Sequence, residues 1–396
     1  MATRSLREIY GHFGPGHASD IEREVDRLQS ALSKAQIKEI TSKGSYVLTV
    51  LEEDECQQQD VRSAEVWVKR ILSIAWGSLS TIRIIDDRSS LTNMVDALDA
   101  SFVGCNVTKL SLCHYLITAS LAVNEGRRPP GLLLHGPPGT GKTRVAKSLA
   151  AVIGLQSHVI NAGNLGSQAA ETFLFGEREV YVGSNMGSIA LGLKQTQTMN
   201  PLYIIDEIDK CANSVQDCFL SLMNGHDAVQ DSYLGDLFPI DPKTFVFVFT
   251  CNSIEGMSRP LVDRCVQIDC NGYTVDEKVK IAEDFMSRYY TGSEIQDGLL
   301  VAMARSTEKE PGFRGMEKII AKTVSQAKMR DLAESGSVNR RSVSHRHRAL
   351  SVTFDDWHDA SNPSVDTWNA FTQYLRSNSP KHKIPRPRPR KRRKKI

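Results

Sequence analysis

The stretch Gly131-Leu-Leu-Leu-His-Gly-Pro-Pro-Gly-Thr-Gly-Lys-Thr143 decides the fold of this chain. Apolar residues run into a glycine-rich turn, and a helical pattern follows the turn. The apolar residues that share one face of that pattern are Val145, Ala146, Leu149, Ala150 and Ile153. Strand, turn and helix in this order form the setting that the phosphate-binding motif G-x-x-x-x-G-K-S/T requires. The stretch therefore predicts a binding site for a nucleoside triphosphate, ATP.

The composition of the motif follows from its task. Glycines let the backbone curl so that successive N–H groups point at an anion, and the N-terminus of the following helix adds its positive end. Lys142 can reach the β- and γ-phosphates, and the Thr143 hydroxyl can bind Mg²⁺. The predicted nucleotide-binding residues are Gly136, Pro137, Pro138, Gly139, Thr140, Gly141, Lys142 and Thr143.

Further apolar runs predict the other strands of an α/β fold. They cover 157–161, the segment from Pro201 to the carboxylates at 206–207, 245–252 and 265–269. Continuous apolar strands that alternate with helices are typical of a parallel sheet with helices on both faces. Ligands of such sheets bind at the carboxyl ends of the strands. The phosphate loop, the acidic pair and Asn252 all fall at such ends, so we predict that they form one site.

The residue types at this edge predict hydrolysis of the triphosphate. Asp206 would hold the Mg²⁺ shell, and Glu207 would orient or deprotonate the attacking water. The amide of Asn252 could hydrogen-bond both that water and the γ-phosphate. Taken alone, the acidic pair could also cap the next helix and Asn252 could form a turn. The phosphate loop favours the catalytic interpretation of the pair, whereas the signal of Asn252 alone is weak.

The overall composition is that of a globular protein, with 40% apolar and 24% charged residues among 396. No run approaches the roughly 18 apolar residues of a membrane span, and the N-terminus lacks the apolar core of a secretory signal. Its few arginines leave only a weak case for a mitochondrial transit peptide. Eight cysteines without a C-x-x-C pair argue against a zinc site or disulfides, and favour reduced thiols in the cytoplasm or nucleus.

The flanking regions read as helical. Apolar residues recur at a 4-3-4-3 spacing over 18–41, which indicates a short coiled coil or a helix pair within the chain, and Gly44 breaks the pattern. A second helical stretch covers 61–76, and a third covers 89–123 with an interruption near Gly104. The expected parts are a helical region over 1–88, the large α/β domain over 89–272, a small helical domain over 273–361 and a basic tail over 362–396.

The positive charge is concentrated in the tail. Ten of the 49 basic residues lie between Lys381 and Lys395, which leaves 39 against 46 acids and a net charge of −7 elsewhere. Alternating arginine and proline followed by a basic run is typical of a disordered segment. It could be recognised by a nuclear import receptor, bind nucleic acid phosphates, or serve only solubility.

The motifs GPPGTGKT, IIDEID, TCNS, PLVDRC and GFRGMEK, in this order, resemble those of the AAA+ ATPases. More closely, the chain resembles the ATPase module of the Lon protease family. That likeness rests on EREVYVGSNMGSIALGLKQTQTMNPLYIIDEIDK, SRPLVDRCVQIDCNGYTVDEKVKIAE and PGFRGMEKII. It extends from about residue 61 to about residue 360, roughly three quarters of the chain. It implies a parallel-sheet ATPase core with a small helical domain, assembled as a homo-oligomeric ring that is expected to be a hexamer.

The resemblance also implies roles that spacing alone does not. Arg264, with Arg259 as a second candidate, matches the arginine finger that reaches the nucleotide of a neighbouring subunit. Arg314 matches the sensor-2 arginine, which contacts nucleotide within its own chain. Tyr181 and Val182 match the aromatic pore loop that grips an extended polypeptide. Without the family, Arg264 could be a surface ion-pair partner and Tyr181 a core residue.

The chain departs from the family where the protease should follow. Only about 35 residues come after the helical domain, and no segment resembles the one that carries the serine of the Ser–Lys dyad. We therefore expect an ATPase that pulls on polypeptides and has no peptidase site of its own. Two alternatives remain open, an ATP-dependent remodeller of nucleic acid and the ATPase subunit of a split protease.

Overall fold

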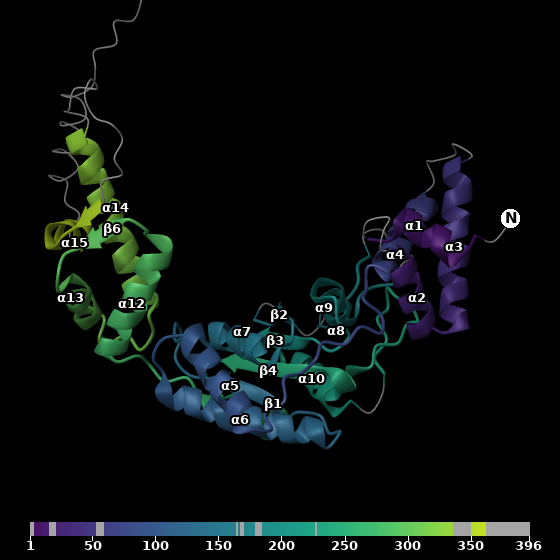
Figure 1. Ribbon diagram of the computed structural model, residues 1–396, viewed down its shortest axis with the longest axis horizontal. Coiled ribbons are helices and arrows are strands. Elements are labelled where there is room, and N and C mark those ends of the chain that lie inside the picture. Colours follow the sequence, from purple (N-terminus) through teal and green to yellow (C-terminus); the bar gives the residue numbers. More distant parts are fainter. Residues whose placement is uncertain are drawn as a thin grey trace, which may run out of the picture. The chain divides into compact units, whose positions relative to one another are not determined.

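The computed structural model of the protein describes residues 4–15, 21–52, 59–163, 165–166, 170–178, 184–225, 228–335 and 350–361. The chain divides into two compact units, one ending at Tyr273 and the other beginning at Thr274. Figure 1 labels most of their helices and strands, numbered in the order of the sequence. In the part of the chain that is described, no helix is long and apolar enough to span a bilayer.

The first unit contains a parallel sheet of five strands in the order β2-β3-β4-β1-β5. The strands are β1 (Gly131–His135), β2 (Ser157–Asn161), β3 (Leu202–Asp206), β4 (Val246–Cys251) and β5 (Cys265–Asp269). The α/β fold class with a parallel sheet is confirmed, and each strand lies where an apolar run predicted one. Because β1 lies between β4 and β5, the phosphate loop that follows β1 lies beside the ends of both.

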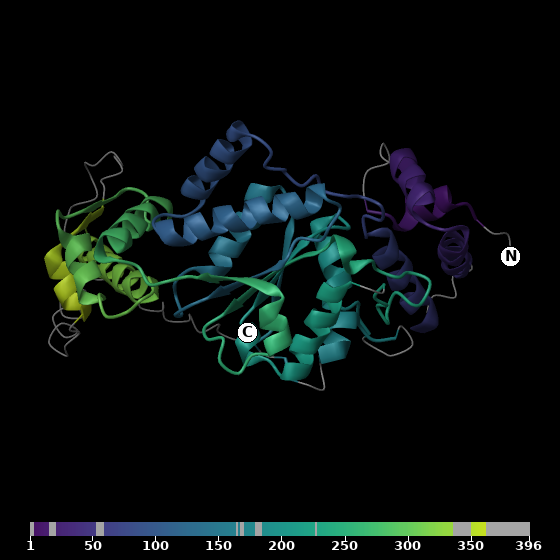
Figure 2. The ribbon, with the colours of Figure 1, turned by 90° about the horizontal axis from the view of Figure 1, so that it is seen from below.

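The central strands β1, β3 and β4 are covered on both faces, which explains why they are apolar along almost their whole length. Leu132 and Leu134 pack into one core with α5 (Arg88–Ser101), α6 (Asn106–Asn124) and α7 (Lys142–Ile153). Leu133 packs into the other with α8 (Ala170–Phe175), α9 (Ser188–Thr196), α10 (Asn213–Asn224) and α11 (Arg259–Asp263). Figure 2 shows the strands between these helices. Successive side chains of a strand point to opposite faces, so these central strands contribute to both cores.

The N-terminal helices belong to the first unit and share its larger core. They are α1 (Leu6–Phe13), α2 (Ile21–Ala31), α3 (Lys34–Glu52) and α4 (Gln59–Leu72). The Trp67 indole N–H donates to the Tyr233 carbonyl at 3.1 Å, and the Gln36 amide donates to the Leu237 carbonyl at 2.7 Å. These bonds tie α3 and α4 to the segment between α10 and β4.

The prediction that Gly44 breaks the helical pattern was wrong. Helix α3 runs through Gly44 and continues to Glu52. A Cβ atom at Gly44 would lie 2.7 Å from the Ile9 side chain, closer than non-bonded carbons approach. Glycine therefore serves here to let α1 pack closely on α3, and its helix propensity, about 1 kcal/mol below that of alanine, is outweighed by tertiary contacts.

The second unit is mainly helical, and its core is formed by apolar side chains of its helices and of β7. Its elements are α12 (Val275–Tyr289), β6 (Ser293–Ile295), α13 (Leu299–Ser306), α14 (Arg314–Ser335), β7 (Leu350–Val352) and α15 (Phe354–Ser361). Strands β6 and β7 form a two-stranded parallel sheet that the sequence did not predict. Each has three residues, too few for alternation to be recognised.

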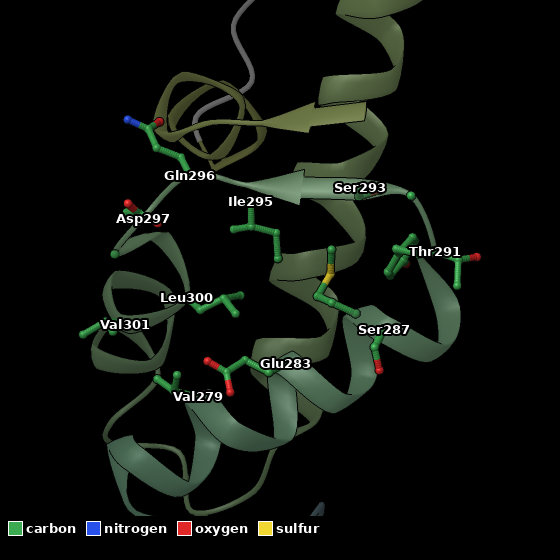
Figure 3. A pocket seen from close by; sticks show the side chains of 14 residues that line it. Val279, Glu283, Ser287, Thr291, Ser293, Ile295, Gln296, Asp297, Leu300 and Val301 are labelled. Carbon is green, nitrogen blue, oxygen red and sulfur yellow. The ribbon is translucent and has the colours of Figure 1, made fainter. Parts of the chain in front are cut away.

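A pocket of 520 Å³ opens between α12, β6 and α13 of this unit. Figure 3 shows its lining residues from close by, with the side chains of Ile295 and Leu300 beside acidic Glu283 and Asp297. None of the residues that the sequence assigned to the nucleotide lines this pocket.

Asp231 joins two loops of the first unit. The side chain is buried, and its carboxylate accepts hydrogen bonds from the backbone N–H groups of Gly187 (2.8 Å), Tyr233 (3.0 Å) and Leu234 (3.1 Å). These bonds connect the start of α9 with the segment that follows α10. Burial raises the pKa of Asp231 to about 6, although the three N–H donors oppose the shift.

We expect Asp231 to make the protein more stable as the pH falls. Because its pKa is higher in the folded chain than the ordinary 3.8, protonation favours the folded state. This contribution is complete below about pH 4 and is lost as the pH rises through about 6. Asp231→Asn cannot titrate. The unfolding free energy of the wild type minus that of the variant should therefore grow by roughly 2 kcal/mol between pH 7.5 and 4.5.

Urea unfolding of both proteins across this range measures that difference, since the titration of other groups cancels between them. A difference that stays constant with pH would contradict the raised pKa.

Candidate nucleotide-binding site

The loop between β1 and α7 has the backbone of a phosphate-binding loop. Gly136 has φ of 146°, and a Cβ atom there would lie 2.4 Å from the Cys270 carbonyl oxygen. Gly141 has φ of 82° and directly precedes α7. Only glycine adopts these conformations without strain, and Gly136 also permits the close approach of the chain after β5.

Lys142 is the charged centre of the loop. Its ammonium donates to the carbonyls of Gly136 (2.7 Å) and Pro137 (2.9 Å) and to the Asn252 side-chain oxygen (3.0 Å). The side chain is only 8% exposed, and burial lowers the pKa of Lys142. Lys142 follows β1 and Asn252 follows the neighbouring β4, so the structure brings together two residues that lie 110 positions apart.

Thr143 and Asp206 meet beside the lysine. The Thr143 hydroxyl lies 2.9 and 3.0 Å from the two carboxylate oxygens of Asp206. Thr250 also donates to Asp206, and its hydroxyl accepts the Glu207 N–H at 3.2 Å. Thr250 is a member of this site that was not predicted from the sequence. Its only signal was its place two residues before Asn252 at the end of an apolar strand.

These oxygen atoms fit Mg²⁺. The ion takes oxygen ligands and is commonly held by one or two carboxylates together with substrate phosphates. Thr143 and Asp206 supply a hydroxyl and a carboxylate that already touch. Within the described residues no cluster of three or more histidine, cysteine or acidic side chains could hold a metal by itself. A hard ion that shares its ligands with a nucleotide is the kind that the Thr143 hydroxyl and the Asp206 carboxylate suit.

Glu207 stands at the rim of the site in an unusual conformation. Its φ of 59° is left-handed, which is rare for a residue with a side chain and common where function demands it. Its side chain is 41% exposed and pairs with Lys210 at 2.7 Å. A Cβ atom at Gly163 would lie 2.7 Å from a Glu207 carboxylate oxygen. The carboxylate is thus accessible from solvent while Gly163 and Lys210 limit its positions.

Asp209 supports the same end of the sheet, a role that was not predicted from the sequence. Its carboxylate accepts the backbone N–H groups of Asn252 (3.0 Å) and Ser253 (3.4 Å). These bonds hold the end of β4 against the segment after β3. The third acid of the IDEID run was the signal that could have identified it.

The three arginines predicted from the sequence are all exposed. Arg264 is exposed and directly precedes β5, at the amino ends of the strands, whereas the phosphate loop follows their carboxyl ends. A strand of five residues is about 16 Å long. The fold therefore separates Arg264 from the phosphate loop of its own chain. Arg259 begins α11 and is exposed, and Arg314 begins α14 of the second unit and is exposed.

Two predictions lie outside the described residues. They are the pore loop at Tyr181 and Val182 and the basic tail from Lys381 to Lys395.

The chain is similar in sequence to an ATPase family and to Lon proteases. Residues 132–271 match the model of the ATPase family associated with various cellular activities (AAA). The mitochondrial Lon protease homolog of Yarrowia lipolytica is 31% identical over 351 residues, which cover 85% of this chain and 29% of that protein. The Lon protease of Nitratidesulfovibrio vulgaris is 29% identical over 385 residues, or 91% and 45%. The chain thus spans less than half the length of these relatives.

Among solved structures, the Thermotoga maritima RuvB Holliday junction branch migration motor is similar, with a TM-score of 0.44 and 19% identity. The matched part covers 67% of this chain and 72% of that one.

Proposed function

Because the chain carries an AAA ATPase domain that resembles the ATPase module of Lon proteases, we propose that it is a ring-forming motor in which ATP hydrolysis drives the pulling of a polypeptide. Nucleotide binding and hydrolysis are the activity of this domain family. The ring and the polypeptide substrate are the further steps of the proposal. The main support for the proposal is that Lys142, Thr143, Asp206 and Asn252 lie together at the carboxyl ends of the strands of one sheet.

Each residue at that edge has a role suited to its chemistry. The Lys142 ammonium would exchange its carbonyl partners for β- and γ-phosphate oxygens, and Asn252 would hold the lysine and the γ-phosphate in register. Thr143 and Asp206 would hold Mg²⁺, which neutralises charge on the phosphate oxygens when bound. The accessible carboxylate of Glu207 would orient the attacking water and accept its proton. Arg314 would contact the nucleotide from the second unit.

The position of Arg264 supports a ring. An arginine at the amino ends of the strands cannot serve the phosphate loop at their carboxyl ends. It can serve the loop of an adjacent copy, and its guanidinium is always charged and can bind two oxygens at once. Head-to-tail contacts of this kind close into rings, and the Lon resemblance suggests a hexamer.

A polypeptide is the substrate that the relatives favour, since both are named as Lon proteins. We propose that Tyr181 and Val182 form the loop that grips it. If nucleic acid were the substrate instead, DNA would stimulate hydrolysis and an unfolded protein would not. The basic tail would then be the nucleic-acid contact, whereas under the leading proposal it serves nuclear import.

Lys142→Ala is expected to abolish ATP binding, because the only side-chain ammonium within the loop is removed. Wild-type ATPase activity should rise when a permanently unfolded protein is added, and should not rise with DNA. Lys147→Ala, which removes an exposed lysine from the same helix, is the matched control and should bind ATP normally. Tight ATP binding by the Lys142 variant, or stimulation by DNA alone, would refute the corresponding half of the proposal.

A further inference from the structure

Tyr273 contacts the phosphate loop from the last position of the first unit. Its hydroxyl donates to the Thr140 carbonyl oxygen at 2.7 Å. Thr140 is itself 2% exposed, and its side chain donates to the Pro137 carbonyl at 3.0 Å. The residue that follows Tyr273 is Thr274, which caps α12 of the second unit. A single side chain thus joins the nucleotide loop to the segment that leads into that helix.

The tyrosine hydroxyl also lies against the next residue of the loop. A Cβ atom at Gly141 would be 3.1 Å from it, so the glycine leaves room for the phenol. Burial raises the pKa of Tyr273 above its ordinary value, and the neighbouring Cys105 thiol adds to the shift. The phenol therefore stays protonated at any pH at which the protein is handled, and it remains a hydrogen-bond donor to Thr140.

The contact between Tyr273 and Thr140 also fixes the direction of the neighbouring Gly141 N–H. A trans peptide is planar, so the Thr140 C=O and the Gly141 N–H point in opposite directions. Glycine residues have little preference between conformations with positive and negative φ, and a peptide between a residue and a glycine can rotate at small cost. A carbonyl that rotated toward bound phosphates would repel them, whereas an N–H in that place attracts them.

We propose that Tyr273 is a positioning residue for nucleotide binding, which holds the Thr140 carbonyl outward so that the Gly141 N–H faces the phosphates. This inference rests on the proposed function, since it assumes that the loop binds a nucleotide. Because the hydroxyl acts on the loop and not on the reacting atoms, its loss should weaken the binding of ADP and ATP alike. It should raise KM and leave kcat nearly unchanged.

Tyr273→Phe removes only the hydroxyl. The expected result is a loss of ADP affinity of about 2- to 10-fold by isothermal titration calorimetry, the range that one neutral hydrogen bond supports. KM for ATP should rise by a similar factor. Both changes should be the same from pH 6 to pH 9, because the wild-type phenol does not ionise in that range.

Tyr115→Phe is the matched control. The Tyr115 hydroxyl donates to the Pro130 carbonyl at 3.0 Å, and its side chain is 2% exposed. This bond lies just before β1, away from the loop that follows the strand. The two variants should lose similar thermal stability, while only Tyr273→Phe loses ADP affinity.

The outcomes separate this inference from the proposed function. If the wild type binds ADP and Tyr273→Phe binds it equally well, the positioning role is overturned and the proposed function stands. If both tyrosine variants lose affinity in proportion to their lost stability, the hydroxyl has a general structural role and the inference is also overturned. If the wild type does not bind ADP, the proposed function itself fails.

Discussion

Arg264→Ala is expected to hydrolyse ATP about 10³- to 10⁵-fold more slowly than the wild type, the range measured for arginine fingers. ATP affinity should be almost unchanged, because Arg264 lies at the edge of the sheet opposite its own phosphate loop. Steady-state hydrolysis together with equilibrium binding of ATP measures both quantities. Arg259→Ala is the matched comparison, since it removes an exposed arginine at the other end of the same short helix.

Mixed rings test whether the site is shared between copies. A Lys142→Ala subunit retains Arg264, and an Arg264→Ala subunit retains its phosphate loop. Where the two meet in a mixed ring, Arg264 of the first can face the intact phosphate loop of the second and complete an active site. Activity should therefore recover on mixing two preparations that are each inactive. No recovery at any ratio, or full activity of Arg264→Ala alone, would refute the shared site. A loss confined to Arg259→Ala would transfer the role to that residue.

Glu207→Gln is expected to lower kcat by about 10²- to 10⁴-fold, the usual contribution of general base catalysis. The amide keeps the size of the side chain and can still orient water, but it does not accept a proton. ATP should bind with unchanged affinity, because the phosphate contacts come from Lys142 and the loop. Single-turnover hydrolysis separates the chemical step from binding.

Asp217, an exposed acid on α10, provides a control for the loss of one negative charge in Glu207→Gln. Asp217→Asn removes one negative charge from the surface and should leave kcat unchanged. If Glu207→Gln turns over at a rate near that of the wild type, the base must be another group, and the left-handed backbone of Glu207 would need another explanation.

Much of the fold could be predicted from local sequence patterns. The glycine-rich turn and the apolar runs around it depend on interactions within about ten residues, so they can be read before any tertiary contact is known. The alternation of strands and helices then implied a parallel sheet, and a parallel sheet places all strand ends with the same polarity at one edge. This is why Lys142 and Asn252 could be predicted to lie together although 110 positions separate them.

Other features could not be predicted because their cause lies in distant residues. Gly44 looks like a helix terminator in isolation, and only the position of Ile9 on a neighbouring helix shows why a glycine is needed within α3. The strands β6 and β7 stabilise each other across more than 50 residues, and neither is long enough to show a pattern alone. The roles of Thr250 and Asp209 depend on the pairing of β3 with β4.

The sequence by itself determined that a phosphate loop and an acidic strand end exist, since both are contiguous motifs whose chemistry follows from their residue types. The tertiary structure alone decided which groups meet there. Thr143 contacts Asp206, and the Tyr273 hydroxyl contacts Thr140, because the order of the strands and the path after β5 bring them within hydrogen-bond distance. The opposite placement of Arg264 has the same origin. In a parallel sheet all strands begin at one end and finish at the other. A residue that precedes one strand therefore lies at the opposite end of the sheet from a loop that follows another strand.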